Sequence, residues 1–135
     1  MIKIVIPLAP ITKKNSSQIL VNKTTNRPFI MPSKRYKTYE EEAGWYIKCK
    51  NENISYPVNI KCLFYMPTKR KVDLSNLISA AMDLLVHYKV IEDDNCDIVI
   101  SNDGSRVRYD KEFPRSEIYI EDYGVFMSDM LRNAK

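Results

Sequence analysis

The stretch Lys69-Arg70-Lys71-Val72-Asp73-Leu74-Ser75-Asn76-Leu77 joins three cations to the start of an amphipathic pattern. Apolar residues continue from it at spacings of three and four, which predicts a helix that packs one face on a core. The apolar set is Leu74, Leu77, Ile78, Ala81, Leu84, Leu85 and Tyr88. Asp73 begins this helix, and the acidic turn Glu92-Asp93-Asp94-Asn95 follows it. The chain between Asp73 and Asp94 is long enough to run out and return, so we expect the two carboxylates to be able to share a metal ion.

Length and composition predict one folded domain over residues 1–135. With 44% hydrophobic and 28% charged residues the chain is typical of a globular protein, which excludes wholesale disorder. The net charge of +4 permits an acidic partner such as nucleic acid without requiring one. No apolar run is long enough for a membrane span or a signal peptide, so we expect a cytoplasmic protein.

The cysteines argue against a soft-metal site. Cys49, Cys62 and Cys96 stand far apart, and His87 is the only histidine that could join them. A structural zinc site needs four such ligands at characteristic spacings. Reduced thiols in a cytosolic protein, each a small buried hydrophobe, are the simpler interpretation.

The periodicity of the remaining chain predicts a mixed fold. Strands are expected over residues 1–6, 58–65, 95–101 and 117–120, and a helix over about 34–51 with Ser33 as its N-cap. Residues 7–33 are expected to form long loops, with a hairpin that joins 18–21 to 28–31. A short helix is expected after Gly124. The predicted class is α/β (α+β), a small mixed β-sheet of about four strands packed with two main helices and a short C-terminal one.

Acidic and basic residues that suit metal-assisted chemistry on nucleic acid stand close together in this sequence. A hard divalent cation binds carboxylate oxygens, and a nucleic-acid backbone binds cations near that metal. The carboxylates are those of Asp73 and of the acidic turn, and residues 69–71 supply the cations. Each group also has a plain structural interpretation, Asp73 as a helix N-cap and residues 92–94 as a solvated turn.

The order of these features resembles the RusA family of Holliday junction resolvases. It runs from Met66-Pro67 through a basic run and Asp-Leu-x-Asn-Leu to an Asp-Asp pair, with Ala-Ala-Met-Asp-Leu-Leu at residues 80–85. The 21 positions from Asp73 to Asp94 fit the family pattern without a gap. Weaker similarities are an early Pro-x-x-Pro loop that ends in Lys-Lys-Asn at residues 13–15 and the helix start at residues 33–39.

The resemblance implies one RusA-like endonuclease domain that acts as a homodimer on four-way junctions and other branched DNA. It implies symmetric cutting of two strands with Mg²⁺, or with Mn²⁺ in its place, in the recombination and repair of a bacterium or phage. The family's acidic residues carry over onto Asp73 and Asp94, with Asp93 beside them. The cations expected to hold the DNA backbone are Lys13, Lys14, Lys69, Arg70, Lys71 and Arg106.

Two positions depart from the family pattern. Ser75 stands where the family's Asp-Leu-Asp-Asn-Leu has its second Asp, and a hydroxyl is a weaker, uncharged metal ligand. Ser79 stands one turn later, where the family has a Lys. We expect Glu92 or Asp103 to replace the missing acidic ligand, although Asp103-Gly104 is also simply a turn dipeptide. We expect Arg106 or Lys71 to replace the missing Lys. We expect Asp83 to be structural and His87 to end the helix.

Two other functions remain open on the sequence alone. A junction-binding protein that kept the basic residues and lost nuclease activity with the second Asp is the nearer alternative. A structural or protein-interaction domain, in which Asp73 is only a cap, is the more distant one. Salt-dependent DNA affinity separates the second from the first, and nicking separates both from an endonuclease.

Overall fold

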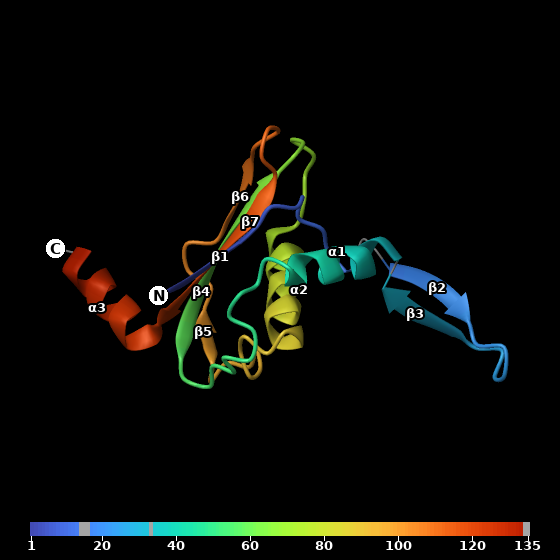
Figure 1. Cartoon of the computed structure of the whole chain (residues 1–135), viewed down its shortest axis with the longest axis horizontal. Helices are drawn as coiled ribbons and strands as arrows, with labels where there is room; N and C mark the ends of the chain where they lie inside the picture. Colours follow the sequence, from blue (N-terminus) through green and yellow to red (C-terminus); the bar gives the residue numbers. More distant parts are fainter. Residues whose placement is uncertain (14–16, 33, 134–135) are drawn as a thin grey trace.

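The computed structural model describes residues 1–13, 17–32 and 34–133, and Figure 1 shows how their elements are arranged. In chain order the elements are β1 (Ile2–Ile6), β2 (Ser17–Val21), β3 (Pro28–Pro32), α1 (Lys34–Gly44), β4 (Val58–Met66), α2 (Leu74–His87), β5 (Val99–Ser101), β6 (Arg106–Tyr109), β7 (Arg115–Asp122) and α3 (Tyr123–Asn133). The predicted mixed class is confirmed, with a mixed sheet of five strands and three helices in the described residues.

The main sheet has the order β1-β7-β4-β5, and β6 also pairs with β4. β7 is antiparallel to both of its neighbours, β1 and β4. β5 and β6 run parallel to β4, β5 beside its first residue, Val58, and β6 beside its last, Met66. The end of β6 therefore lies beside the start of the basic loop that leads into α2.

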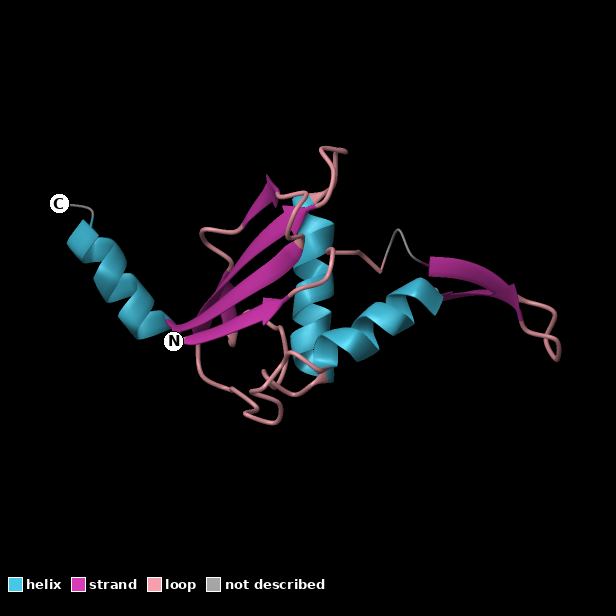
Figure 2. Ribbon diagram, turned by 45° about the horizontal axis from the view of Figure 1, so that its top comes forward, coloured by secondary structure: helices cyan, strands magenta, loops and turns pink. Residues whose placement is uncertain are grey.

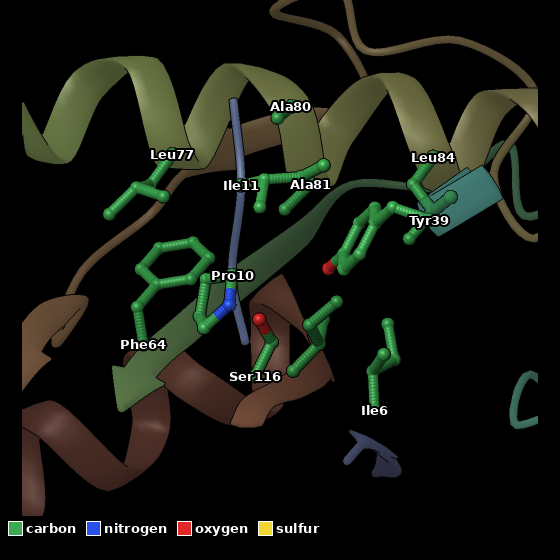
Figure 3. Close-up of a pocket in the computed structure, with 11 residues that line it drawn as sticks. Ile6, Pro10, Ile11, Tyr39, Phe64, Leu77, Ala80, Ala81, Leu84 and Ser116 are labelled. Atoms are coloured by element: carbon green, nitrogen blue, oxygen red, sulfur yellow. The ribbon is translucent and has the colours of Figure 1, made fainter. Parts of the chain in front are cut away.

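The core lies between α2 and one face of this sheet (Figure 2). Alternate residues of the strands point into it, as in β4, where Ile60, Cys62 and Phe64 are buried. Figure 3 shows the apolar side chains that close this interface around a void of only about 10 Å³. Burial raises the pKa of the Cys62 thiol to about 12, so this cysteine is an inert core residue. A void of this size holds no ligand, so the functional site lies elsewhere.

Two elements project from the body in opposite directions (Figures 1 and 2). The β2–β3 hairpin, which the sequence predicted, forms its own two-stranded antiparallel sheet. α3 leaves the end of β7 and buries none of its described side chains. Within residues 1–13, 17–32 and 34–133, no helix has both the length and the apolar character to cross a bilayer.

The first helix is shorter than predicted, because α1 ends at Gly44 and not near residue 51. The Tyr88 ring packs where a Cβ on Gly44 would lie, and its hydroxyl donates to the Glu40 carbonyl. The amides of residues 45 and 46 donate to carbonyls three residues earlier, which closes the helix. Its predicted cap, Ser33, lies outside the described residues.

The strand predicted over residues 95–101 is confirmed only for 99–101. Residues 95–98 form a turn instead, in which the Asn95 carbonyl accepts from the amides of Ile98 and Val99. The last strand is longer than predicted, and β6 was missed altogether. All four residues of β6 are exposed, so its sequence lacks the apolar alternation that marks a half-buried strand.

Candidate active site

Asp73 is the N-cap of α2 and the centre of the candidate site. Its backbone is extended, and its Oδ1 accepts from the Ser75 amide at 3.2 Å and the Ser75 hydroxyl at 2.8 Å. The capping interpretation of Asp73 is therefore confirmed. Ser75 holds this exposed carboxylate in one orientation at the start of α2.

An open hollow of about 340 Å³ lies at Asp73. Its wall combines four separate segments: the loop 9–12, Arg35 at the start of α1, the loop 66–73 and Leu77 of α2. Arg35 and Arg70 thus share one hollow with the Asp73 carboxylate. Guanidinium groups bind phosphate oxygens through paired hydrogen bonds, and a carboxylate binds a hard cation. The hollow has the chemistry for a phosphodiester accompanied by a divalent metal.

The basic loop continues from this hollow onto an edge of the sheet. The Lys69 ammonium lies 5.3 Å from the centre of the Tyr109 ring, at the end of β6. Lys71 is exposed, as are Arg106 and Arg108 on β6. Lys69, Lys71, Arg106 and Arg108 therefore form one basic border where the loop meets β6.

Of the two N-terminal lysines predicted to bind DNA, the structure describes only Lys13. Lys13 lies 3.8 Å from the Asp83 carboxylate and 5.6 Å from the centre of the Tyr36 ring. Its ammonium is thus partly engaged with the body of the protein through Asp83. Lys14 lies outside the described residues.

The acidic turn lies at the other end of α2 (Figure 1). Asp93 accepts from the Asp94 amide at 2.8 Å and from the Asn95 side chain at 3.1 Å. These hydrogen bonds, the backbone one first, lower the pKa of Asp93, so its charge is secure at neutral pH. The Glu92 amide pairs with the Ile54 carbonyl and ties the turn to the segment before β4. The turn is a fixed and exposed set of carboxylates.

One chain does not bring Asp73 and Asp94 together. The 14 residues of α2 lie between them, and at 1.5 Å per residue the helix alone is about 20 Å long. Among the described residues, no group of three or more His, Cys, Asp or Glu side chains could hold a metal ion. In a single copy, α2 therefore separates Asp73 from the acidic turn.

Comparison with known protein families matches residues 7–121 to Endodeoxyribonuclease RusA. The chain belongs to the RusA endodeoxyribonuclease family. The match covers the loop 9–12, Arg35, both ends of α2 and the basic border, so all parts of the candidate site fall within it. Among curated proteins, no sequence matches the chain. Family membership indicates an endodeoxyribonuclease, the class of enzyme that hydrolyses phosphodiester bonds within DNA.

The two departures from the RusA pattern fall on one exposed side of α2. Ser75 donates to Asp73, so the hydroxyl supports the carboxylate that it accompanies. Ser79 is exposed one turn later and adds no charge. The α2 end of the candidate site thus contains the Asp73 carboxylate, and Arg35 and Arg70 line the same hollow.

Asp103 is not among the residues that line the hollow at Asp73. Its amide donates to the Asn59 side chain at 2.9 Å, which fixes the turn after β5. It borders a hollow with Lys61 and Tyr119, on the sheet face opposite α2. Glu92, the other candidate, adjoins Asp93 and Asp94 in the acidic turn. His87 is the last residue of α2, as expected.

Sequence reasoning missed Arg35 as a site residue. Arg35 lies 38 positions before Asp73, and only the packing of α1 and the loop 9–12 beside α2 brings the two to one hollow. Its basic neighbours Lys34 and Lys37 were a signal of function, but no spacing rule links them to Asp73.

Proposed function

We propose that this protein is a Mg²⁺-dependent, structure-selective endodeoxyribonuclease that resolves Holliday junctions by paired symmetric nicks in DNA recombination and repair. The observation that carries the proposal is the hollow that Asp73, Arg35 and Arg70 line together. A phosphodiester bound there meets two guanidinium groups and a metal-binding carboxylate together. Membership of the RusA family supplies the nuclease activity, and the branched substrate follows from that family.

The donors present suit Mg²⁺, with Mn²⁺ as a substitute. Oxygen ligands are what both hard cations take, and the exposed candidates here are carboxylate and hydroxyl oxygens. The Asp73 carboxylate lies at one end of α2, and those of Asp93 and Asp94 lie at the other, with Glu92 adjacent. When bound, the metal would polarise the scissile phosphate and lower the pKa of an attacking water.

Two copies of the chain are needed to complete such a site. Because α2, about 20 Å long, lies between Asp73 and the acidic turn, we infer that a shared metal requires the Asp73 end of one copy to meet the acidic turn of the other. A two-fold dimer repeats this meeting, since a contact from residue i to residue j is matched by j to i. The dimer then has two equivalent sites, one for each strand of a symmetric junction.

The remaining residues of the site bind and orient DNA. Arg70 and Arg35 would hold oxygens of the reacting phosphate, where charge develops as the bond to the leaving oxygen breaks. Lys69, Lys71 and Arg106 would hold neighbouring phosphates along the basic border, which gives affinity without base readout.

A junction-binding protein without nuclease activity is the alternative, and a specific observation favours it. Ser75 and Ser79 stand at two positions where the family pattern has an acid and a base, and neither serine is charged. Such a protein would bind junctions through the same arginines and lysines.

Cleavage of a labelled synthetic four-way junction with Mg²⁺ or Mn²⁺ tests the proposal. The wild type is compared with Asp73→Asn and Asp94→Asn, and binding is measured on the same samples. Paired nicks that vanish in both variants while binding persists are expected. Binding without nicks under either cation would establish the alternative, and an absence of salt-dependent affinity would contradict both.

A further inference from the structure

The positive charge of the chain is concentrated at its N-terminal end. The first 39 residues contain eight Lys and Arg and no Asp or Glu, and the first acidic residue is Glu40. The remaining 96 residues contain 13 cations and 17 anions. The modest net charge of +4 therefore conceals a strongly basic segment attached to a slightly acidic body.

The β2–β3 hairpin raises part of this charge away from the body (Figures 1 and 2). Its turn is internally fixed: the Asn22 side chain accepts from the amides of Thr24 and Thr25 at 2.9 and 3.2 Å. The Asn22 amide donates to the Arg27 carbonyl, which closes the turn across its base. Lys23 and Arg27 are exposed at this tip. The tip is therefore a turn held by its own hydrogen bonds, and it presents two cations and two threonine hydroxyls.

The base of the hairpin joins the candidate active site through α1. Lys34, Arg35 and Lys37 lie in the first turn of α1, where no acidic residue accompanies them. Cations at a helix N-terminus oppose the helix dipole and lower the stability of the helix. An anion bound there would offset this penalty, because the helix dipole and the neighbouring lysines both favour negative charge at that end. Arg35 itself lines the hollow at Asp73, so this run of cations begins at the candidate active site.

We propose that the first turn of α1 and the β2–β3 hairpin form an arm that holds the phosphate backbone of the DNA beyond the cut. The proposal rests on the function proposed above. The arm begins at Arg35 and Lys34 and ends at Lys23 and Arg27. Its partner is duplex DNA, because a run of exposed cations with no acidic residue matches a uniformly anionic polymer.

The length of the arm sets where its tip meets the DNA. Each strand of the hairpin has five residues, which at about 3.3 Å per residue gives about 17 Å, and the turn extends this to about 20 Å. Along one DNA strand, at 3.4 Å per nucleotide, this distance corresponds to about six nucleotides. Lys23 and Arg27 therefore contact phosphates about half a helical turn from the cut.

The test is the salt dependence of junction binding for the double variant Lys23→Gln/Arg27→Gln. Loss of two phosphate contacts lowers the slope of log K against log salt by about 2, and affinity at physiological salt falls about tenfold or more. The cleavage rate at saturating protein stays that of the wild type, because neither residue lines the hollow. Lys48→Gln/Arg132→Gln is the matched control, since it removes two exposed cations outside the arm.

A second experiment locates the phosphates that the tip of the hairpin contacts. Single neutral methylphosphonate linkages are introduced along one strand, at successive steps from the cut. Wild-type affinity is expected to fall at linkages about five to seven nucleotides away, and the tip variant loses this sensitivity.

Three results would distinguish a failure of the proposed arm from a failure of the proposed function. A tip variant with the slope and linkage profile of the wild type overturns the arm while nuclease activity stands. A tip variant that dissociates into monomers with its salt slope unchanged assigns the hairpin to an interface between copies and also overturns it. A wild type that binds no DNA overturns the proposed function itself.

Discussion

At the scale of single residues, Asp73 has two roles that a substitution can separate. Asn is as good an N-cap as Asp, whereas Ala is a poor one. Asp73→Asn should therefore leave the free energy of unfolding within about 0.5 kcal/mol of the wild type and reduce cleavage about 100-fold or more. Asp73→Ala should lose cleavage and about 1 kcal/mol of stability as well. Urea unfolding beside junction cleavage measures both, and full activity in Asp73→Asn would make Asp73 a cap alone.

Ser75 is the residue whose replacement should improve the site. Ser75→Asp restores a second carboxylate at the start of α2, where the helix dipole also favours negative charge. We expect half-maximal cleavage at a lower Mg²⁺ concentration than for the wild type. The comparison variant is Ser75→Ala, which removes the hydroxyl that orients Asp73 and should need more Mg²⁺. An unchanged Mg²⁺ dependence in both variants would place the metal away from this helix end.

At the scale of elements, an ionic cluster fastens the turn between β6 and β7. Arg115 contacts Asp110 at 2.9 Å and Glu117 at 2.6 Å, and its guanidinium lies 3.7 Å from the centre of the Tyr65 ring. Hydrogen bonding to Arg115 lowers the pKa of Asp110. Burial raises the pKa of Glu117, but hydrogen bonds from Tyr119 and Arg115 outweigh it, so that pKa is also lowered.

This cluster predicts a defined dependence of stability on pH. Carboxyl groups with a lowered pKa in the folded protein stabilise it above their ordinary pKa near 4, and that stability is lost as pH falls through the folded values. Glu117→Gln should lower the urea midpoint at pH 7, and its difference from the wild type should shrink as the pH falls through the lowered pKa values of the cluster. A difference that stays the same throughout an acid titration would show that Glu117 acts through packing.

The elements also show how far the sequence determines the fold. Apolar periodicity was sufficient for β1, β4 and α2, because their buried faces alternate or repeat regularly. It failed for β6, whose exposed residues are fixed by pairing with β4 and not by burial. It also overextended α1, since the packing of Tyr88 on Gly44 is a contact between residues 44 positions apart. The candidate site followed the same rule: Asp73 was found from its motif, and Arg35 was found only from the packing.

At the scale of the whole molecule, the length of α2 is the reason why we propose that two copies make one site. The account predicts a dimer in sedimentation velocity, either free or on junction DNA. A monomer under both conditions would exclude a site shared by Asp73 and the acidic turn, and with it the paired symmetric nicks.

The most direct measurement mixes two inactive variants, Asp73→Asn and Asp94→Asn, under conditions in which subunits exchange. In a mixed dimer, one site receives both substitutions and the other receives neither, because each site takes Asp73 from one copy and Asp94 from the other. The account predicts that the mixture nicks one strand of a labelled four-way junction, although each variant alone nicks none. If sites were formed within single chains, every site would contain one substitution. A mixture that exchanges subunits, binds the junction and still cuts nothing would contradict the shared site.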